Sequence, residues 1–167
     1  MSLSCLMNAW LVRALGRKLL SVNALLHVFE SYRGSIPQEV SLRFEDLESG
    51  RLYCGSDGVS LCFSETTIAE CDLGEYGKLI DFCVSSGGYF FDVVGLRLLS
   101  VSAIKSSVER KVIGVLLLFE YDSFLSILNL GDELFFCDRV PDEIIASEGL
   151  TFVLLGGKGG EENGVRP

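Results

Sequence analysis

The sequence predicts an α+β protein: mainly an antiparallel β-sheet built as a meander, with one N-terminal helix packed on a face. Three observations indicate this fold. Apolar residues recur at three- and four-residue steps over 1–29, which is helical spacing. From residue 39 onward, short runs alternate apolar and polar residues, which is the period of a half-buried strand. Polar turns rather than regular helices separate these runs, so consecutive strands are expected to pair antiparallel.

The N-terminal segment carries no Asp or Glu up to residue 29, but it contains Arg13, Arg17 and Lys18. Three interpretations stay open: a helix docked on the sheet, a targeting presequence, and a helix lying on a membrane surface. We favour the docked helix over a presequence or an extension over 1–24 that lies outside the fold. Gly16 lies near the middle of the segment and weakens a continuous helix there.

A three-stranded meander is predicted over 39–64. In the first strand, Val40, Leu42 and Phe44 alternate with polar residues, which gives the strand one apolar face. The turn before the third strand is rich in Gly and Asp, which tolerate positive φ.

The rest of the chain predicts further strands separated by turns. A surface loop is expected over 65–78, and 124–130 is ambiguous between a strand and a short helix. Asp142 and Glu143 are placed to open a short helix. Further strands are expected at 89–104, 111–122, 134–137 and 150–155. The apolar run 79–84 is expected to be a strand, with a helix as the alternative.

One domain is expected, since a chain of 167 residues can bury a stable core without disulfides or metal ions. Its parts are a helical segment over 1–34, a β-rich body over 35–155 and a disordered Gly-rich tail over 156–167. The tail contains GGKGG at 156–160, but the helix and hydroxyl residue of a phosphate-binding loop do not follow it.

The charge balance limits the partners that the chain can take. Fourteen Lys and Arg stand against 23 Asp and Glu, which gives a formal charge of −9. Such a surface repels nucleic acid and anionic lipid and attracts cationic proteins. No apolar stretch reaches the roughly 18 residues that a membrane-spanning helix needs. We therefore expect no nucleic acid and no membrane among its partners.

Metal and cofactor chemistry has little support in the sequence. His27 is the only histidine, and none of the six cysteines forms a CxxC pair. We expect the cysteines to be buried, reduced thiols, with disulfides as the less favoured alternative, and we expect no metal and no cofactor. No GxSxG elbow is present, so nucleophilic catalysis also lacks a signal.

Acidic residues next to the longest predicted strands are the candidate contact residues for a cationic partner. They are Glu120, Asp122, Asp132 and Glu133. Complementary charge would accelerate the encounter with a basic protein and favour the correct partner. The alternative is that these acids are solvated turn residues that only keep the protein in solution.

The segment from Leu25 to Val140 resembles small acidic bacterial immunity proteins of polymorphic and contact-dependent toxin systems. The resemblance is carried by HVFESYRGSIPQEVSLRFEDLESGRLYC, GSDGVSLCFSE and NLGDELFFCDRVPDE, above all by their LRFED and GDEL stretches. It implies no catalysis, no cofactor, cytoplasmic residence and a cationic partner, commonly a nuclease-like toxin domain. Contact residues in that family vary with the toxin, so the resemblance assigns none here.

The function expected from the sequence is a non-catalytic, acidic protein-binding module that inhibits a basic partner stoichiometrically. The alternatives are an organelle accessory protein directed by a targeting helix and a small carboxylate-dependent enzyme. The identity of the partner and the oligomeric state stay open.

Overall fold

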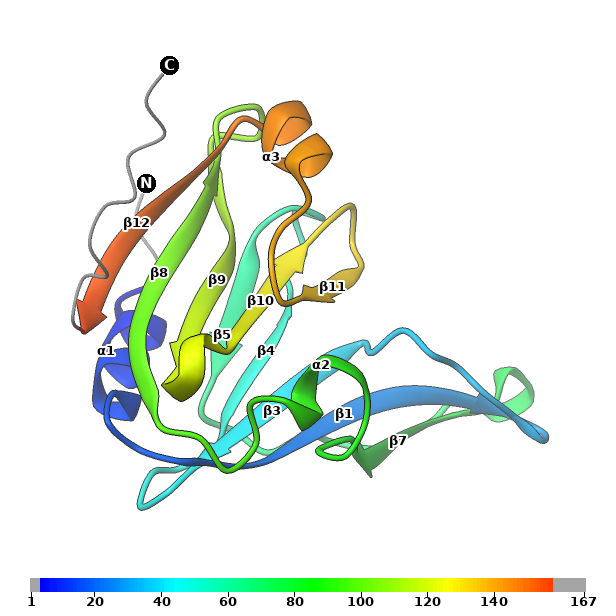
Figure 1. Ribbon diagram of the computed structural model, residues 1–167. Helices are drawn as coiled ribbons and strands as arrows, with labels where there is room; N and C mark the ends of the chain where they lie inside the picture. The colour runs from blue at the N-terminus through cyan, green and yellow to red at the C-terminus, as the bar shows by residue number, and fades with distance from the viewer. Residues whose placement is uncertain (1–3, 158–167) are drawn as a thin grey trace.

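The computed structural model describes residues 4–157, which form two antiparallel sheets facing each other (Figure 1). The first sheet has seven strands in the order β5-β4-β3-β1-β7-β6, with β2 also paired to β1. The second has five strands in the order β11-β10-β9-β8-β12. Every pairing within the sheets is antiparallel, which confirms the predicted α+β fold with a mainly antiparallel sheet.

The strands of the first sheet are β1 (Leu19–Phe29), β2 (Tyr32–Arg33), β3 (Glu39–Phe44), β4 (Gly50–Cys54), β5 (Leu61–Ser64), β6 (Cys71–Asp72) and β7 (Lys78–Cys83). The strands of the second are β8 (Leu98–Ser106), β9 (Lys111–Phe119), β10 (Phe124–Asn129), β11 (Leu134–Cys137) and β12 (Leu150–Gly157). The helices are α1 (Cys5–Ala14), α2 (Gly88–Phe91) and α3 (Asp142–Glu148), with 3-10 turns η1 (Gly74–Tyr76) and η2 (Glu120–Asp122).

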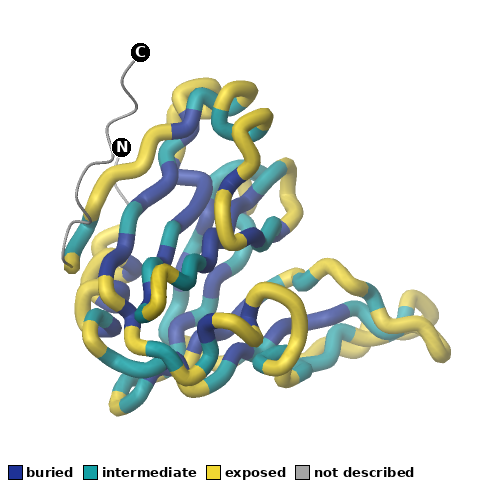
Figure 2. Tube along the Cα trace, viewed as in Figure 1, coloured by how far each residue is buried: buried dark blue, intermediate teal, exposed yellow. Residues whose placement is uncertain are grey.

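The main core lies between the two sheets, and α1 closes one of its open sides (Figures 1 and 2). Phe44 of the first sheet stacks on Phe119 of the second, with 6.5 Å between the ring centroids. Trp10 of α1 is fully buried against Phe44 and Phe63. Its indole Nε1 donates a hydrogen bond to the carbonyl oxygen of Glu48 at 2.8 Å. The prediction of an N-terminal helix packed on a sheet is therefore confirmed.

The extent of that helix was predicted wrongly, because α1 ends at Ala14 and residues 19–29 form β1. Gly16 adopts a φ of +76° in the turn between them. β1 lies inside the first sheet, paired with both β3 and β7, and it is buried in part on both faces. A strand covered on both sides loses the alternation of apolar and polar residues, so its apolar run resembles a helical stripe.

The predicted meander over 39–64 is confirmed as β3, β4 and β5. The ambiguous segment after residue 123 is the strand β10. The single strand expected over 89–104 is wrong in its first half, since α2 occupies Gly88–Phe91 and β8 begins only at Leu98. α2 closes the other side of the core, where Phe90 packs edge-on against Phe136 of β11 at 5.2 Å.

The C-terminal tail was predicted to begin at residue 156, but β12 continues through Gly157. Gly156 lies against Leu15 and Val12 at the end of α1, where a Cβ atom would stand 2.9 Å from Leu15. This close approach holds the end of the strand near the helix. The remainder of the predicted disordered tail, 158–167, lies outside the described residues.

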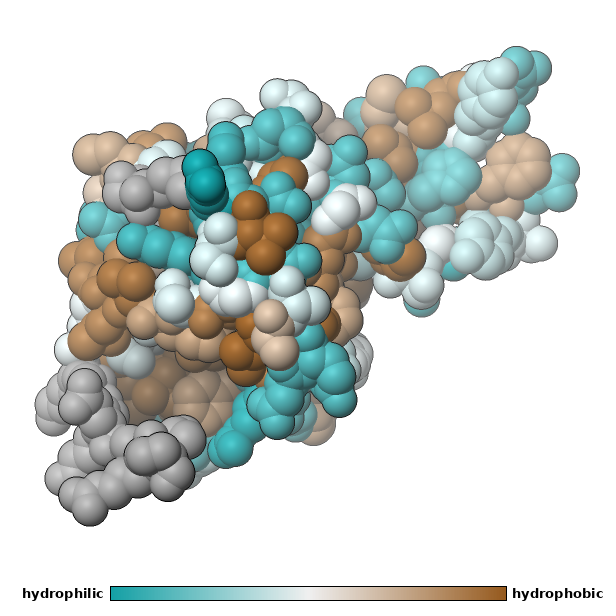
Figure 3. Space-filling view, turned by 90° about the horizontal axis from the view of Figure 1, so that it is seen from above, coloured by the Kyte–Doolittle hydropathy of each residue, from teal (hydrophilic) through white to brown (hydrophobic). Residues whose placement is uncertain are grey.

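An arm projects from the body, made by the far end of β1 with β2, β6 and β7 (Figures 1 and 3). His27 lies on this arm, and its Nε2 is 2.6 Å from the carbonyl oxygen of Tyr76, which makes Nε2 the donor nitrogen. The only histidine of the chain is thus held by a backbone contact between β1 and η1.

Candidate functional site

Two of the four predicted contact residues, Asp132 and Glu133, lie in the turn between β10 and β11 beside the turn between β4 and β5. The backbone N–H of Asp132 donates to the carbonyl oxygen of Gly58 at 3.1 Å. A side-chain bond joins the same turns, from Asn129 Nδ2 to the carbonyl oxygen of Ser60 at 3.0 Å. We call Asp57, Asp132 and Glu133 the acidic end.

The carboxylates of the acidic end differ in whether hydrogen bonds and an ion pair balance their negative charge. Asp57 accepts hydrogen bonds from the N–H groups of Ser60 and Val59 and from the Ser60 hydroxyl, and pairs with Lys111 at 3.1 Å. These bonds hold the pKa of Asp57 well below its usual range. Within residues 4–157, Asp132 and Glu133 form no salt bridge, and both are exposed. They remain available to a cationic group.

Asp57→Asn is expected to destabilise the protein at neutral pH and to lose this effect in acid. The depressed pKa of Asp57 means that its contribution is present above the ordinary aspartate pKa of about 4 and is lost as pH falls below it. Melting temperatures of the variant and the wild type should differ by a constant amount above about pH 5 and converge in more acidic solution. A difference that grows in acid would contradict this assignment.

The six cysteine thiols differ in exposure and in pKa, and these differences can be measured. All six cysteines are free, but Cys137 alone is buried, so the prediction of buried thiols is wrong for the exposed Cys5, Cys71 and Cys83. Burial, and secondarily the nearby Asp132, raises the pKa of Cys54 to about 11. Hydrogen bonds from Ser85 lower the pKa of Cys83.

We expect Cys83 to be alkylated faster than Cys54 at neutral pH, because the thiolate is the reactive form and Cys83 is the more exposed of the two. Timed iodoacetamide labelling followed by peptide mass spectrometry measures both rates in one sample. Cys71 is also exposed, so its labelling rate in the same sample is the internal reference for the other two rates. Faster labelling of Cys54 than of Cys83 would show that the turn between β4 and β5 opens in solution and exposes the Cys54 thiol.

The other two predicted contact residues, Glu120 and Asp122, lie in η2, at the opposite end of β10. Six residues of strand at about 3.3 Å each separate the two pairs by about 20 Å. Glu120 is engaged locally, since its Oε2 accepts the N–H of Arg97 at 3.0 Å. Between the two acids, Tyr121 is 87% exposed. The four predicted residues therefore do not form one site.

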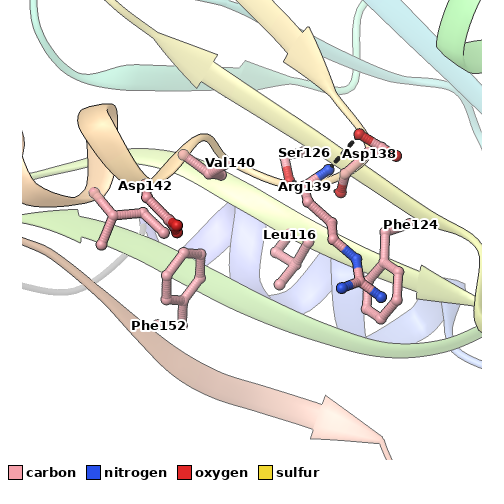
Figure 4. A pocket seen from close by; sticks show the side chains of 9 residues that line it. Leu116, Phe124, Ser126, Asp138, Arg139, Val140, Asp142 and Phe152 are labelled. Carbon is pink, nitrogen blue, oxygen red and sulfur yellow. Dashed lines mark hydrogen bonds between the residues drawn. The ribbon is translucent and has the colours of Figure 1, made fainter. Parts of the chain in front are cut away.

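A groove that the sequence did not predict crosses the outer face of the second sheet (Figure 4). We call it the outer groove; its volume is about 370 Å³, within the range of small-ligand and side-chain sites. Its walls are mainly apolar and come from β9, β10, the segment after β11, α3 and β12. The lining residues are Leu116, Phe124, Ser126, Asp138, Arg139, Val140, Asp142, Ile145 and Phe152.

Few charged groups border the outer groove. The Arg139 guanidinium lies over the ring of Phe124, 5.8 Å from its centroid. Asp138 accepts the backbone N–H of Arg139 at 2.7 Å. Asp142, from the first turn of α3, carries its carboxylate near Phe152, as Figure 4 shows. Asp138, Arg139 and Asp142 lie in the NLGDELFFCDRVPDE stretch, but no sequence signal indicated that they line a groove.

A wider groove of about 720 Å³ follows the hairpin between β3 and β4, with Arg13, Arg43, Glu45, Asp46 and Glu48 on its walls. Its walls are predominantly charged, and Arg13 is already paired with Glu65. The outer groove offers more apolar surface to a partner and is the better candidate for a contact site.

Residues 4–157 contain no group of three or more His, Cys, Asp or Glu side chains arranged to hold a metal ion. Nor does this part of the chain include a helix with the length and apolar character needed to cross a lipid bilayer. Comparisons with protein-family models, curated proteins and solved structures give no match to this chain.

Proposed function

We propose that this protein is a non-catalytic, acidic protein-binding module of the cytoplasm, which neutralises a cationic partner by stoichiometric binding in the manner of an immunity protein. The observation that carries the proposal is the acidic end. Two turns about 75 residues apart in the sequence, which carry these carboxylates, are joined by hydrogen bonds to backbone carbonyls, and Asp132 and Glu133 lack a counter-ion among the described residues. A preorganised set of charges loses little freedom when a basic partner binds.

The packing of α1 supports this proposal over the targeting-helix alternative. Met7, Trp10, Leu11 and Ala14 are buried in the core, so the apolar face of the helix is already occupied by the rest of the fold. A receptor or membrane would have to displace that packing, at a cost of several kcal/mol for the tryptophan alone.

The test uses the separation of the two predicted acidic pairs. Each pair contains one Glu and one Asp, and both Asp residues have positive φ, which Asn tolerates. We expect the double variant Asp132→Asn/Glu133→Gln to bind the partner about tenfold more weakly, mainly through slower association, with a smaller salt dependence. The matched variant Glu120→Gln/Asp122→Asn removes the same charge at the far end of β10 and should change affinity less than about twofold.

The partner for this measurement comes from affinity capture in the native host at low and moderate salt, and binding is then followed by surface plasmon resonance with the purified pair. Equal effects of both double variants would mean that only net charge matters. A partner that binds the acidic-end variant as tightly as the wild type would overturn the proposal.

A further inference from the structure

The described structure has four sheet edges, and they differ in how well they are protected. The first sheet ends at the four-residue β5 and at β6, which is only two residues long. The second sheet ends at the four-residue β11 and at the eight-residue β12. Within residues 4–157, β12 pairs with β8 alone. Its outer edge is therefore the longest open row of backbone donors and acceptors in this part of the chain.

The chemistry of β12 leaves this edge suited to pairing. The strand LTFVLLGG has no charged residue and no proline, the two devices that usually block an edge. Phe152, Val153 and Leu154 are 41%, 39% and 51% exposed, and because neighbouring side chains point to opposite faces, apolar surface is exposed on both. Hydrophobic side chains gather on the left of Figure 3, the side on which Figure 1 draws β12. One register shift, between Leu154 and Gly156, interrupts the pairing near the end.

Acidic groups lie beside this apolar edge. Phe152 belongs both to the edge strand and to the wall of the outer groove, where the Asp142 carboxylate is its neighbour (Figure 4). α3 directly precedes β12 and also carries Glu143 and Glu148. A segment lying along β12 would thus meet apolar side chains along its length, with the Asp142 carboxylate toward the α3 end.

We propose that the outer edge of β12 binds an extended segment of a cationic partner, which adds to the second sheet as a sixth strand. The segment would place apolar side chains against Phe152 and Leu154 and a lysine or arginine toward Asp142. A second copy of this chain fits less well, because it would bring a further formal charge of −9 to an already acidic surface. The cationic character of the segment rests on the proposed function, whereas the free edge does not.

The probe is a synthetic eight-residue peptide of alternating valine and threonine with lysine at both ends, titrated into the isotopically labelled full-length protein. We expect the largest amide chemical-shift changes in 150–157, with a glutamate-flanked peptide binding about tenfold more weakly. A lysine-flanked peptide with N-methyl groups along one backbone edge, which cannot complete the ladder, should not bind. Shifts centred away from β12, or equal binding of the methylated peptide, would overturn the proposal.

Two variants separate this proposal from the proposed function. Leu154→Lys places a charge on the edge at a half-exposed position and should weaken binding of the lysine-flanked peptide at least about tenfold. Tyr121→Lys adds the same charge at the exposed η2 turn and should leave binding unchanged. A captured partner sensitive to loss of the acidic end but indifferent to Leu154→Lys would overturn the edge proposal alone. Sedimentation that shows a wild-type dimer abolished by Leu154→Lys would assign the edge to a second copy instead.

Discussion

Replacing Trp10 with alanine is expected to lower the free energy of unfolding by about 4 kcal/mol, because it opens a large cavity where α1 packs against the core. The indole is fully buried and contacts Phe44 and Phe63 from the first sheet. It also donates the hydrogen bond to the Glu48 carbonyl, which would lose its partner. Since α1 closes one side of the space between the sheets, the loss affects both sheets at once. Urea unfolding followed by circular dichroism measures the change.

Two further substitutions separate the contributions at this position. Trp10→Phe keeps most of the apolar contact but removes the donor, so it should cost about half as much as Trp10→Ala. Leu6→Ala, on the same helix at a side chain that is 50% exposed, should cost less than about 1 kcal/mol. Since alanine is the best helix former, similar losses for Leu6→Ala and Trp10→Ala would mean that the difference in burial described here does not control stability.

Gly114→Ala is expected to cost about 3 kcal/mol, although alanine is otherwise suited to a strand interior better than glycine. Gly114 lies in β9, between Ile104 of β8 and Leu128 of β10. A Cβ atom there would stand 2.6 Å from the carbonyl oxygen of Ile127, a backbone atom that moves only if the central strands separate. The clash is steric, because the φ of Gly114 is not in the left-handed region.

The matched control is Gly87→Ala. Gly87 also has a φ that alanine adopts, at −119°, and the nearest atom to an added Cβ is the Val84 carbonyl oxygen at an ordinary 3.7 Å. This variant should change the free energy of unfolding by less than about 0.5 kcal/mol. If Gly114→Ala is equally neutral in chemical denaturation, then β9 and β10 are not packed as closely as described.

The positions of the four predicted acids show which features local sequence patterns predict and which they do not. The charge of Asp132 and Glu133 and their position in a turn follow from neighbouring residues alone. Their approach to Gly58 depends on the first and second sheets facing each other, which no local pattern reports. Glu120 and Asp122 lie at the other end of β10, because the ambiguous segment 124–130 forms an extended strand between β9 and β11. The four predicted acids are therefore divided between two places.

The groove and the free edge were not foreseen for a related reason. Leu116, Phe124, Ile145 and Phe152 come from four different elements. Local patterns placed Leu116 and Phe152 in strands and left Phe124 between a strand and a helix, and no pattern brought them together. Their half-open position arises because α3 covers only part of the outer face of the second sheet. Which strand ends a sheet depends on the full pairing order, and that order is set by all strands together.

The sequence by itself determined the negative charge, the amphipathic start of the chain, the meander over 39–64 and the mainly antiparallel α+β class. These features depend on backbone periodicity and turn chemistry, which act over a few residues. Only the tertiary structure decided that residues 19–29 form a strand inside the first sheet, that the predicted acids divide, and that β12 keeps a free edge. Those outcomes depend on burial between segments far apart in the chain, and such burial overrides a local helical pattern when a strand is covered on both faces.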